Sequence, residues 1–429
     1  MLMNLFGGKN IMKWLNKGHE FDELGNFFKE NNRIFIAGTL HDNIALYKKL
    51  DFLNCKIERK TCFFLFLFSY LFPPLRDLFF NLWYKYNNLD KETILILNYS
   101  TTGFLSGGGN NFLFKRLQNN KMFKLNKNIF FVDDFIQKYL SIFAFYVSNK
   151  VYLYNVGITV TTVCNLNCTY CLNFVPYDKN QKHIKLDELK KECDNIFKNI
   201  DKVMYFSVSG GEPLLHPDFG ELLKYIYSNY KHKIIFNLGP ATNGTVIPSD
   251  DLCKIFHDCK VTVVCDNYIT VDKTCLTYKK LIKQLKKFHV DHKELLIRHF
   301  FKMFPPDENY ENMYLDSDFI SKYDSCGLPS YKVNFTDVKN GRFYGCCYVS
   351  FAETAGLIKA TDDDYYDISK LLTDAEKKEL IEFKLGYCNK GYMSFCKFCN
   401  QLTNSKPDMG VEQTKGKLNW SCENPTHSY

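Results

Sequence analysis

Three cysteines stand close together near the middle of the chain, in the segment Cys164-Asn-Leu-Asn-Cys168-Thr-Tyr-Cys171. A [4Fe-4S] cluster usually takes four thiolates. A loop that offers three can hold three irons and leave the fourth iron open to a ligand that is not part of the protein. The spacing therefore favours a reactive iron-sulfur site, and a zinc loop with a distant fourth ligand is the alternative.

The elements around this loop follow from the hydrophobic pattern. The β-branched run at 156–161 predicts a strand that ends just before Cys164, and residues 203–209 predict a second strand. Apolar residues at helical spacing predict a helix over 186–200 between them. The second strand runs into Ser209-Gly210-Gly211-Glu212-Pro213. Paired glycines let the backbone approach a ligand closely, and their N–H and C=O groups can bond a small zwitterion.

Together these two motifs resemble the radical S-adenosylmethionine (radical SAM) superfamily. Its signature is CxxxCxxC with an aromatic residue before the last cysteine, here Tyr170. The resemblance implies that a [4Fe-4S] cluster is ligated by Cys164, Cys168 and Cys171, and that SAM is held by Gly210, Gly211 and Glu212, with Ser209 and Asn243 as further contacts. In such enzymes one electron from the reduced cluster cleaves SAM, and the resulting 5′-deoxyadenosyl radical abstracts hydrogen from the substrate.

Strands and helices alternate through the rest of this region. After a helix over 219–230 and a strand over 233–238 comes Thr242-Asn243-Gly244, which the resemblance places near the SAM ribose, although Asn-Gly is also a common turn. The alternation continues with a helix capped by Ser249, a strand over 261–265, a helix over 278–288 and a strand over 294–300. This alternation predicts an α/β fold with a parallel sheet, helices outside it and ligands at the C-terminal strand ends. The resemblance to radical SAM proteins implies a partial (β/α)6 barrel over 151–320.

A second group of cysteines lies beyond the barrel, in the region 321–429. A hairpin is predicted there from the β-rich runs 331–335 and 342–348 and the turn Lys339-Asn340-Gly341. This arrangement resembles the SPASM/twitch extension and implies one auxiliary [4Fe-4S] cluster of the twitch type. Its expected ligands are Cys326, Cys346, Cys396 and Cys399, with Cys388 or Cys347 as substitutes. A structural zinc site is the alternative.

The first 150 residues predict a separate α/β domain. Residues 33–38 and 92–98 have the composition of buried parallel strands, and the region faintly resembles Rossmann-like domains. Because Gly38-Thr-Leu-His-Asp lacks the G-x-G-x-x-G phosphate loop, we expect no bound dinucleotide. The apolar run at 63–72 is too short to span a bilayer as a helix, so burial is expected, with peripheral membrane contact as the alternative.

The composition indicates in which compartment the protein is expected and which partners it is expected to bind. The 17 cysteines stand largely in ligand spacings and no signal peptide precedes them, so a reducing cytoplasm is expected. The net charge of +8 is spread without a basic block, which gives no reason to expect nucleic acid binding. A mildly basic surface would suit an acidic electron donor of the flavodoxin or ferredoxin type.

We therefore expect a radical SAM enzyme that acts on a carbohydrate or nucleotide-linked small molecule, since the N-terminal domain differs from the leader-binding domains of peptide maturases. A radical SAM peptide maturase is the first alternative. A non-catalytic iron-sulfur electron carrier or sensor is the second, and the Gly210-Gly211-Glu212 step speaks against it. The sequence predicts no catalytic acid, base or radical-quenching residue.

Overall fold

The computed structural model describes residues 18–38, 48, 50–53, 57–61, 94–98, 124–125, 127–267, 276–296, 299–300, 336–386, 408–409 and 413. Contacts divide the chain into two units. One is His19–Tyr152, and the other contains Leu153–Tyr429. Each unit is described by itself.

The unit His19–Tyr152 is built on a parallel sheet with the strand order β2-β1-β3-β4. Its elements are α1 (Gly18–Glu30), β1 (Ile34–Gly38), η1 (Asp51–Leu53), β2 (Ile57–Thr61), β3 (Ile94–Asn98), β4 (Ile129–Phe131), α6 (Val132–Asp134), η3 (Phe135–Tyr139) and α7 (Leu140–Ser148). The prediction of two buried parallel strands is confirmed, because β1 and β3 pair in parallel and the side chains at 34–36 and 94–96 are fully buried. The apolar run at 63–72 lies outside the described residues. None of the helices that the structure describes has the length and apolar character needed to cross a membrane.

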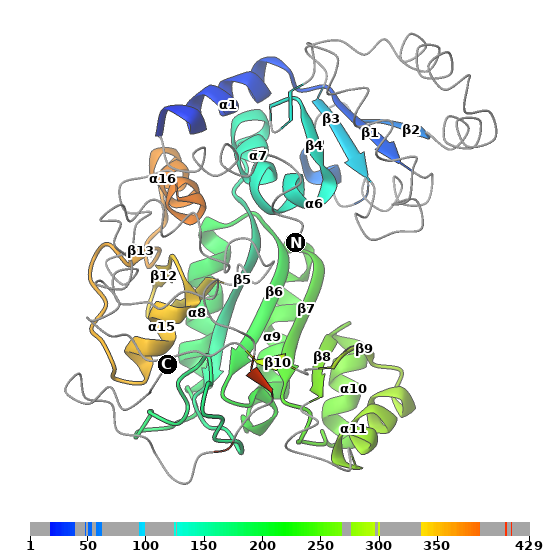
Figure 1. Ribbon diagram of the computed structural model, residues 1–429, viewed down its shortest axis with the longest axis vertical. Coiled ribbons are helices and arrows are strands. Elements are labelled where there is room, and N and C mark those ends of the chain that lie inside the picture. Colours follow the sequence, from blue (N-terminus) through cyan, green and yellow to red (C-terminus); the bar gives the residue numbers. More distant parts are fainter. Residues whose placement is uncertain are drawn as a thin grey trace. The chain divides into compact units, whose positions relative to one another are not determined.

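The second unit holds an eight-stranded sheet with the order β13-β12-β11-β5-β6-β7-β8-β9 (Figure 1). The elements of its first part are β5 (Tyr152–Thr161), α8 (Leu186–Asn199), β6 (Lys202–Gly210), η4 (Pro213–Leu215), α9 (Phe219–Tyr230), η5 (Lys231–Lys233), β7 (Ile234–Thr242), α10 (Asp250–Asp258), β8 (Thr262–Asn267), α11 (Leu276–Lys287), β9 (Asp291–Leu296) and β10 (His299–Phe300). The remaining elements are β11 (Thr336–Lys339), β12 (Arg342–Tyr344), α15 (Cys347–Thr354), β13 (Tyr365–Asp367), α16 (Asp374–Leu385) and β14 (Asp408–Met409).

The predicted alternation of strands and helices is confirmed in the first part of this unit. Strands β6, β7 and β8 each pair in parallel with the next strand of the series, which ends at β9, and Ser249 caps α10 by accepting a hydrogen bond from the Leu252 N–H. Two predicted boundaries are wrong. β7 continues to Thr242, and the run 294–300 is divided between the end of β9 and the separate strand β10. A further strand, β11, joins the same sheet and pairs in parallel with β5.

The two faces of the sheet differ in polarity. Phe206 of β6 contacts Phe197 of α8, with 5.0 Å between their ring centres, so the helix covers that face. Since side chains alternate along a strand, Ser207 and Ser209 lie on the opposite face. There the Ser207 hydroxyl donates to the side-chain oxygen of Asn155, over 2.9 Å. This opposite face therefore carries hydroxyl and amide groups, next to the ring of Tyr205, which contacts Tyr154 and Phe236.

The predicted hairpin turn in the C-terminal region is confirmed, and the hairpin joins the main sheet. Its first arm is β11, whereas the run 331–335 predicted for that arm lies outside the described residues. β11 and β12 are antiparallel around Asn340 and Gly341, which both have positive φ, as a two-residue turn requires. β11 also pairs in parallel with β5, which the sequence did not indicate. The second arm was predicted to reach Tyr348, but β12 ends at Tyr344 and Cys347 begins α15. Apolar residues four apart in 347–352 carry the helical period, which outweighs their strand propensity.

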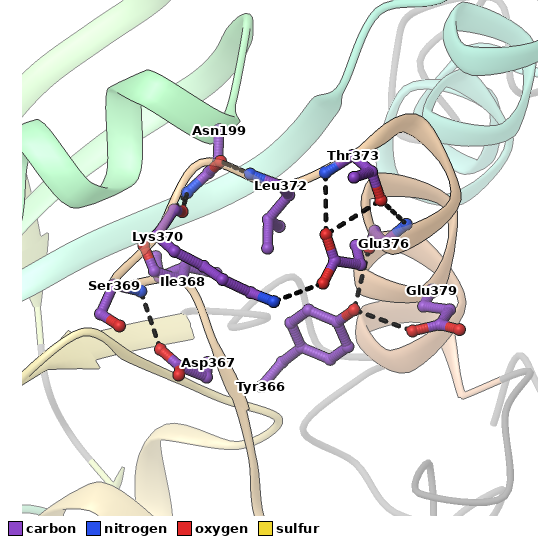
Figure 2. A network of polar contacts seen from close by, with 10 residues as sticks. All are labelled: Asn199, Tyr366, Asp367, Ile368, Ser369, Lys370, Leu372, Thr373, Glu376 and Glu379. Atoms are coloured by element: carbon purple, nitrogen blue, oxygen red, sulfur yellow. Dashed lines mark hydrogen bonds and ion pairs between the residues drawn. The ribbon is translucent and has the colours of Figure 1, made fainter.

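A polar network ties the segment after β13 to helix α8 (Figure 2). The Asn199 side chain, 2% exposed, donates to the carbonyls of Ile368 and Lys370 and accepts the Leu372 N–H at 2.9 Å. Thr373 and Glu376 then form a capping box at the start of α16. These contacts, together with the Gly341 N–H that donates to Glu192 of α8, fasten the C-terminal region to the helix layer.

Candidate active site

The cysteine loop leaves and rejoins the sheet at the C-terminal end of β5. At its base the Thr162 N–H donates to the Lys182 carbonyl over 3.0 Å, and the Lys182 N–H donates to the Thr162 hydroxyl over 2.9 Å. The Ile184 N–H also donates to the Val160 carbonyl. The loop is therefore closed at its base. Its position directly after a strand is as predicted.

The three thiols of the loop lie near one another and are partly exposed. Burial raises the pKa of Cys164 and of Cys168 to about 12, and the neighbouring Cys171 adds to both increases. Among the described residues, no three His, Cys, Asp or Glu side chains are close enough to hold one metal ion. This does not conflict with a cluster, because each thiolate of a [4Fe-4S] cluster binds its own iron.

Three N–H groups point at the sulfur atoms of this loop. Cys164 Sγ lies 3.4 Å from the Leu166 backbone nitrogen and 3.7 Å from Asn243 Nδ2. Cys168 Sγ lies 3.2 Å from Gln413 Nε2. Hydrogen bonds to sulfur stabilise anionic thiolates and the clusters that they ligate. Three thiols surrounded by N–H donors fit a bound [4Fe-4S] cluster.

The two glycines after β6 allow that strand to pass against the start of the cysteine loop. A Cβ atom on Gly210 would lie 2.5 Å from the Thr161 carbonyl oxygen, and one on Gly211 would lie 2.4 Å from the Val163 carbonyl oxygen. The Gly211 and Glu212 N–H groups donate to the carbonyls of Thr161 and Val163. The N–H of Gly211 is therefore bonded within the protein, and the carbonyl groups of the two glycines remain the predicted contacts with a ligand. An ammonium group needs acceptors, so the predicted contact with the methionine amino group rests on carbonyl and carboxylate oxygens.

Glu212 joins the ends of two strands through its side chain. The residue is fully buried, one carboxylate oxygen accepts the Leu214 N–H at 3.1 Å, and the other accepts the Asn243 N–H at 2.8 Å. Burial raises the pKa of Glu212 to about 7, although these hydrogen bonds oppose the rise. The carboxylate thus holds the Thr242-Asn243 turn next to the cysteine loop.

The sequence analysis did not predict four polar residues at this site, which are Asn165, Asn173, Thr245 and Gln413. Asn165 bonds the side chains of Asn243 and Thr245, and Asn173 donates to the Gly210 carbonyl. Asn165 and Asn173 flank the cysteines, so their positions were a signal that could have been used. Gln413 carried no such signal, because it belongs to a distant segment.

The remaining predicted residues are of three kinds: predicted contacts of SAM, the neighbouring cysteines at 346 and 347, and cysteines outside the described residues. Tyr170 lies in the cysteine loop and is partly exposed, and the Ser209 hydroxyl lies 3.4 Å from that of Thr159. Cys346 is partly exposed beside Cys347, and a hydrogen bond from the Cys347 thiol lowers the pKa of Cys346. The predicted ligands outside the described residues are Cys326, Cys388, Cys396 and Cys399.

Cys347 is part of a hydrophobic core. It is 2% exposed and lies in one cluster with Tyr344, Tyr348 and Phe351. The buried Lys384 faces this pair of cysteines, and burial lowers its pKa to about 8. Of the two neighbours, Cys346 is therefore the one that can reach a metal centre at the surface of this core.

Comparison with known proteins identifies the domain that carries the cysteine loop. Residues 158–296 match the model of the Radical SAM superfamily. The chain carries a radical SAM domain. The radical SAM match marks the chain as an enzyme, and the family implies a [4Fe-4S] cluster and SAM.

Curated relatives align with the chain over about 100 residues. One is an S-adenosylmethionine-dependent nucleotide dehydratase of Selenomonas ruminantium, 32% identical over 24% of this chain and 36% of the relative. Another is a GTP 3′,8-cyclase of Clostridium acetobutylicum, 36% identical over 21% of this chain and 27% of the relative. A third is the antilisterial bacteriocin subtilosin biosynthesis protein AlbA of Bacillus subtilis, 30% identical over 22% of this chain and 19% of the relative. The chain spans about a third or less of the length of these relatives.

Similar solved structures include native anSMEcpe with bound AdoMet, which is 15% identical over 57% of this chain and 88% of that chain, with a TM-score of 0.36. BtrN in complex with AdoMet and 2-DOIA is 16% identical over 61% of this chain and 99% of that chain, with a TM-score of 0.37. Similarity at this level carries no argument about the substrate.

Proposed function

We propose that this chain reductively cleaves SAM at a [4Fe-4S] cluster and uses the resulting 5′-deoxyadenosyl radical to abstract hydrogen from a substrate. The observation that supports this most is one bonded network at the strand ends. It joins the three-thiol loop, the Gly210-Gly211-Glu212 step and Asn243 through the contacts of Glu212 with the Val163 carbonyl and the Asn243 N–H.

The residues of this network have different proposed roles. Cys164, Cys168 and Cys171 ligate the cluster, and the iron that has no cysteine ligand binds SAM. Gly210, Gly211 and Glu212 hold SAM: the Gly210 and Gly211 carbonyls accept hydrogen bonds from its ammonium group, and the buried Glu212 carboxylate fixes the Asn243 turn beside them. Ser209, Asn243 and Tyr170 complete the surroundings of SAM.

A carbohydrate or nucleotide-linked small molecule is the proposed substrate. The polar face of the sheet supports it, because Asn155, Thr159, Ser207 and Ser209 present neutral hydroxyl and amide groups there. Two of the relatives named above act on nucleotides by their names. A peptide is the alternative, since AlbA belongs to the biosynthesis of a bacteriocin.

The other parts of the chain have proposed roles as well. Residues 151–320 would form a partial (β/α)6 barrel and residues 321–429 a twitch-like region with a second [4Fe-4S] cluster on Cys326, Cys346, Cys396 and Cys399. Residues 1–150 would be a Rossmann-like domain for substrate or partner binding. A flavodoxin or ferredoxin would supply electrons in the cytoplasm, and no nucleic acid is needed.

The test is anaerobic reconstitution of the full chain, reduction with dithionite and assay of 5′-deoxyadenosine after addition of SAM. We expect deoxyadenosine from the wild type and none from Cys168→Ala. The matched control is Cys259→Ala, at the end of α10, where the cysteine is 5% exposed and far along the chain from the loop. A full iron content without SAM cleavage would contradict the proposal and favour the electron carrier or sensor.

The substrate class is tested by added compounds. GTP and UDP-glucose serve as probes, and a rise in deoxyadenosine with a change in the mass of the probe supports the nucleotide-linked class. If neither probe acts, and a cell extract stimulates the reaction until it is treated with protease, the peptide alternative replaces it.

A further inference from the structure

One side chain from the far end of the chain contacts the cysteine loop. Gln413 stands 245 positions after Cys168, and its Nε2 lies 3.2 Å from Cys168 Sγ. Its Oε1 accepts the backbone N–H of Asn167 at 2.6 Å. Cys168 and Gln413 also form an antiparallel backbone bridge. Gln413 is therefore bonded to the loop through both its backbone and its side chain.

The orientation of the Gln413 amide follows from these partners. The Asn167 N–H can only donate, so the oxygen end of the amide must face it. The nitrogen end then faces Cys168 Sγ and presents an N–H to the sulfur. A glutamine at this position satisfies both neighbours at once.

The segment that carries Gln413 is held at a second point. β14 (Asp408–Met409) pairs antiparallel with β10 (His299–Phe300), which follows the last strand of the parallel series (Figure 1). Four positions later the backbone bridge with Cys168 begins. Two backbone attachments close together leave Gln413 little freedom to move away from the sulfur.

We propose that Gln413 is a positioning residue that tunes the catalytic cluster through its hydrogen bond to the Cys168 sulfur. This inference rests on the proposed function. Reduction adds negative charge to a cluster, and an N–H donor at a ligand sulfur stabilises the reduced state more than the oxidised state. The Gln413 amide therefore raises the reduction potential, which makes the reducing electron easier to obtain from the donor protein.

Two substitutions distinguish the effect of this hydrogen bond on the reduction potential from an effect on folding. Gln413→Leu removes the N–H donor together with the acceptor for Asn167. Gln413→Glu has nearly the same shape and keeps that acceptor, but places a negative oxygen near the sulfur. We expect Leu to reduce the equilibrium constant for one-electron reduction about tenfold, which corresponds to about 59 mV. We expect Glu to lower it further.

The measurement is a redox titration of the reconstituted full chain by EPR, using the cluster signal that changes when SAM is added. Iron content is determined on the same samples. Gln284→Leu is the matched control, because Gln284 lies on α11 and bonds Asp250 and the Pro248 carbonyl. Its potential should equal that of the wild type.

Unchanged potentials in both Gln413 variants at full iron content would overturn the inference. If the Leu variant loses iron, the Glu variant decides, since it keeps the bond to Asn167. The proposed function is tested independently of this inference. If the wild type never cleaves SAM, the proposed function is wrong, but the Gln413 variants can still differ from the wild type in reduction potential.

Discussion

At Gly211 the chain passes within contact distance of the backbone at the start of the cysteine loop. An added Cβ would lie 2.4 Å from the Val163 carbonyl oxygen, and backbone atoms cannot move aside as the end of a flexible side chain can. Val163 directly precedes Cys164, so relief of the clash displaces the first of the proposed cluster ligands. The glycine is therefore needed for the shape of the loop before any ligand binds.

We expect Gly211→Ala to lower the iron content of the reconstituted chain by about half, since the catalytic cluster is one of two proposed, and to cost about 1–3 kcal/mol of stability through overpacking. Iron assay and thermal unfolding measure the two effects. Gly356→Ala is the control for the added methyl group, because a Cβ at Gly356 meets nothing within 4 Å, although Gly356 has a positive φ of 74°. That variant should lose about 1–2 kcal/mol and keep its iron. Equal iron in both variants would contradict the argument.

A buried carboxyl group on β11 makes stability depend on pH. Asp337 is fully buried, accepts hydrogen bonds from the hydroxyls of Thr159 and Ser350, and has its pKa raised by burial to about 6. The folded chain thus binds this proton more tightly than the unfolded chain, whose carboxyl titrates near pH 4. The contribution of Asp337 to stability is complete below about pH 4 and is lost as the pH rises through 6.

We expect Asp337→Asn to remove this dependence, so that its free energy of unfolding gains up to about 3 kcal/mol relative to the wild type between pH 4 and pH 7. Urea unfolding at several pH values measures it. Asp251→Asn, on the surface of α10, is the control for the loss of a charge. Its free energy of unfolding should vary with pH in the same way as that of the wild type. A curve for Asp337→Asn that also runs parallel to the wild type would refute the prediction.

Helix α15 and the cysteine loop share one hydrophobic core. After Cys171 the loop turns at Phe174, which has a φ of 54° and is fully buried. Its ring lies 4.8 Å from that of Tyr348 on α15. Since α15 begins directly after Cys346, this core connects the region of the predicted auxiliary cluster to the loop of the catalytic cluster.

We expect Tyr348→Ala to cost about 3–5 kcal/mol and to lower the occupancy of the catalytic cluster, because the loop loses its support. Phe256→Ala, in the buried face of α10, removes a ring of similar size away from the loop and is the control. Iron per folded chain and the EPR signal that responds to SAM distinguish the two. If both variants lose the signal equally, the effect is one of general stability.

Local patterns predicted most of the elements that carry the site. The strand before Cys164, the helix from Leu186 and the Ser249 cap depend on neighbours within a few residues, and all three are present. Pairings between distant segments were not predictable from one sequence. β11 beside β5 and Gln413 beside Cys168 each require knowledge of which surfaces meet in the fold. The close approach of the two glycines to Thr161 and Val163 was not predictable for the same reason, since that backbone belongs to another segment of the chain.

For the molecule as a whole, the number of clusters distinguishes the twitch-like hypothesis from a single site. We expect about eight irons per reconstituted chain and about four in Cys346→Ala, with the SAM-responsive signal retained. Cys347→Ala should keep about eight, because Cys347 belongs to the core, and should lose only about 1 kcal/mol of stability. Iron and zinc analysis measures all three proteins. Full iron in Cys346→Ala would exclude Cys346 as a ligand.

The pairing of β11 with β5 also has a consequence during synthesis. β5 is complete once Thr161 has left the ribosome, but its partner begins only at Thr336. At about 5–20 residues per second, the wait is on the order of ten seconds or more. Throughout that interval one side of β5 has no strand from β11 to bond, and an open strand edge is a template for another chain. The newly made protein is therefore most exposed to mispairing at the strand that carries its cysteine loop.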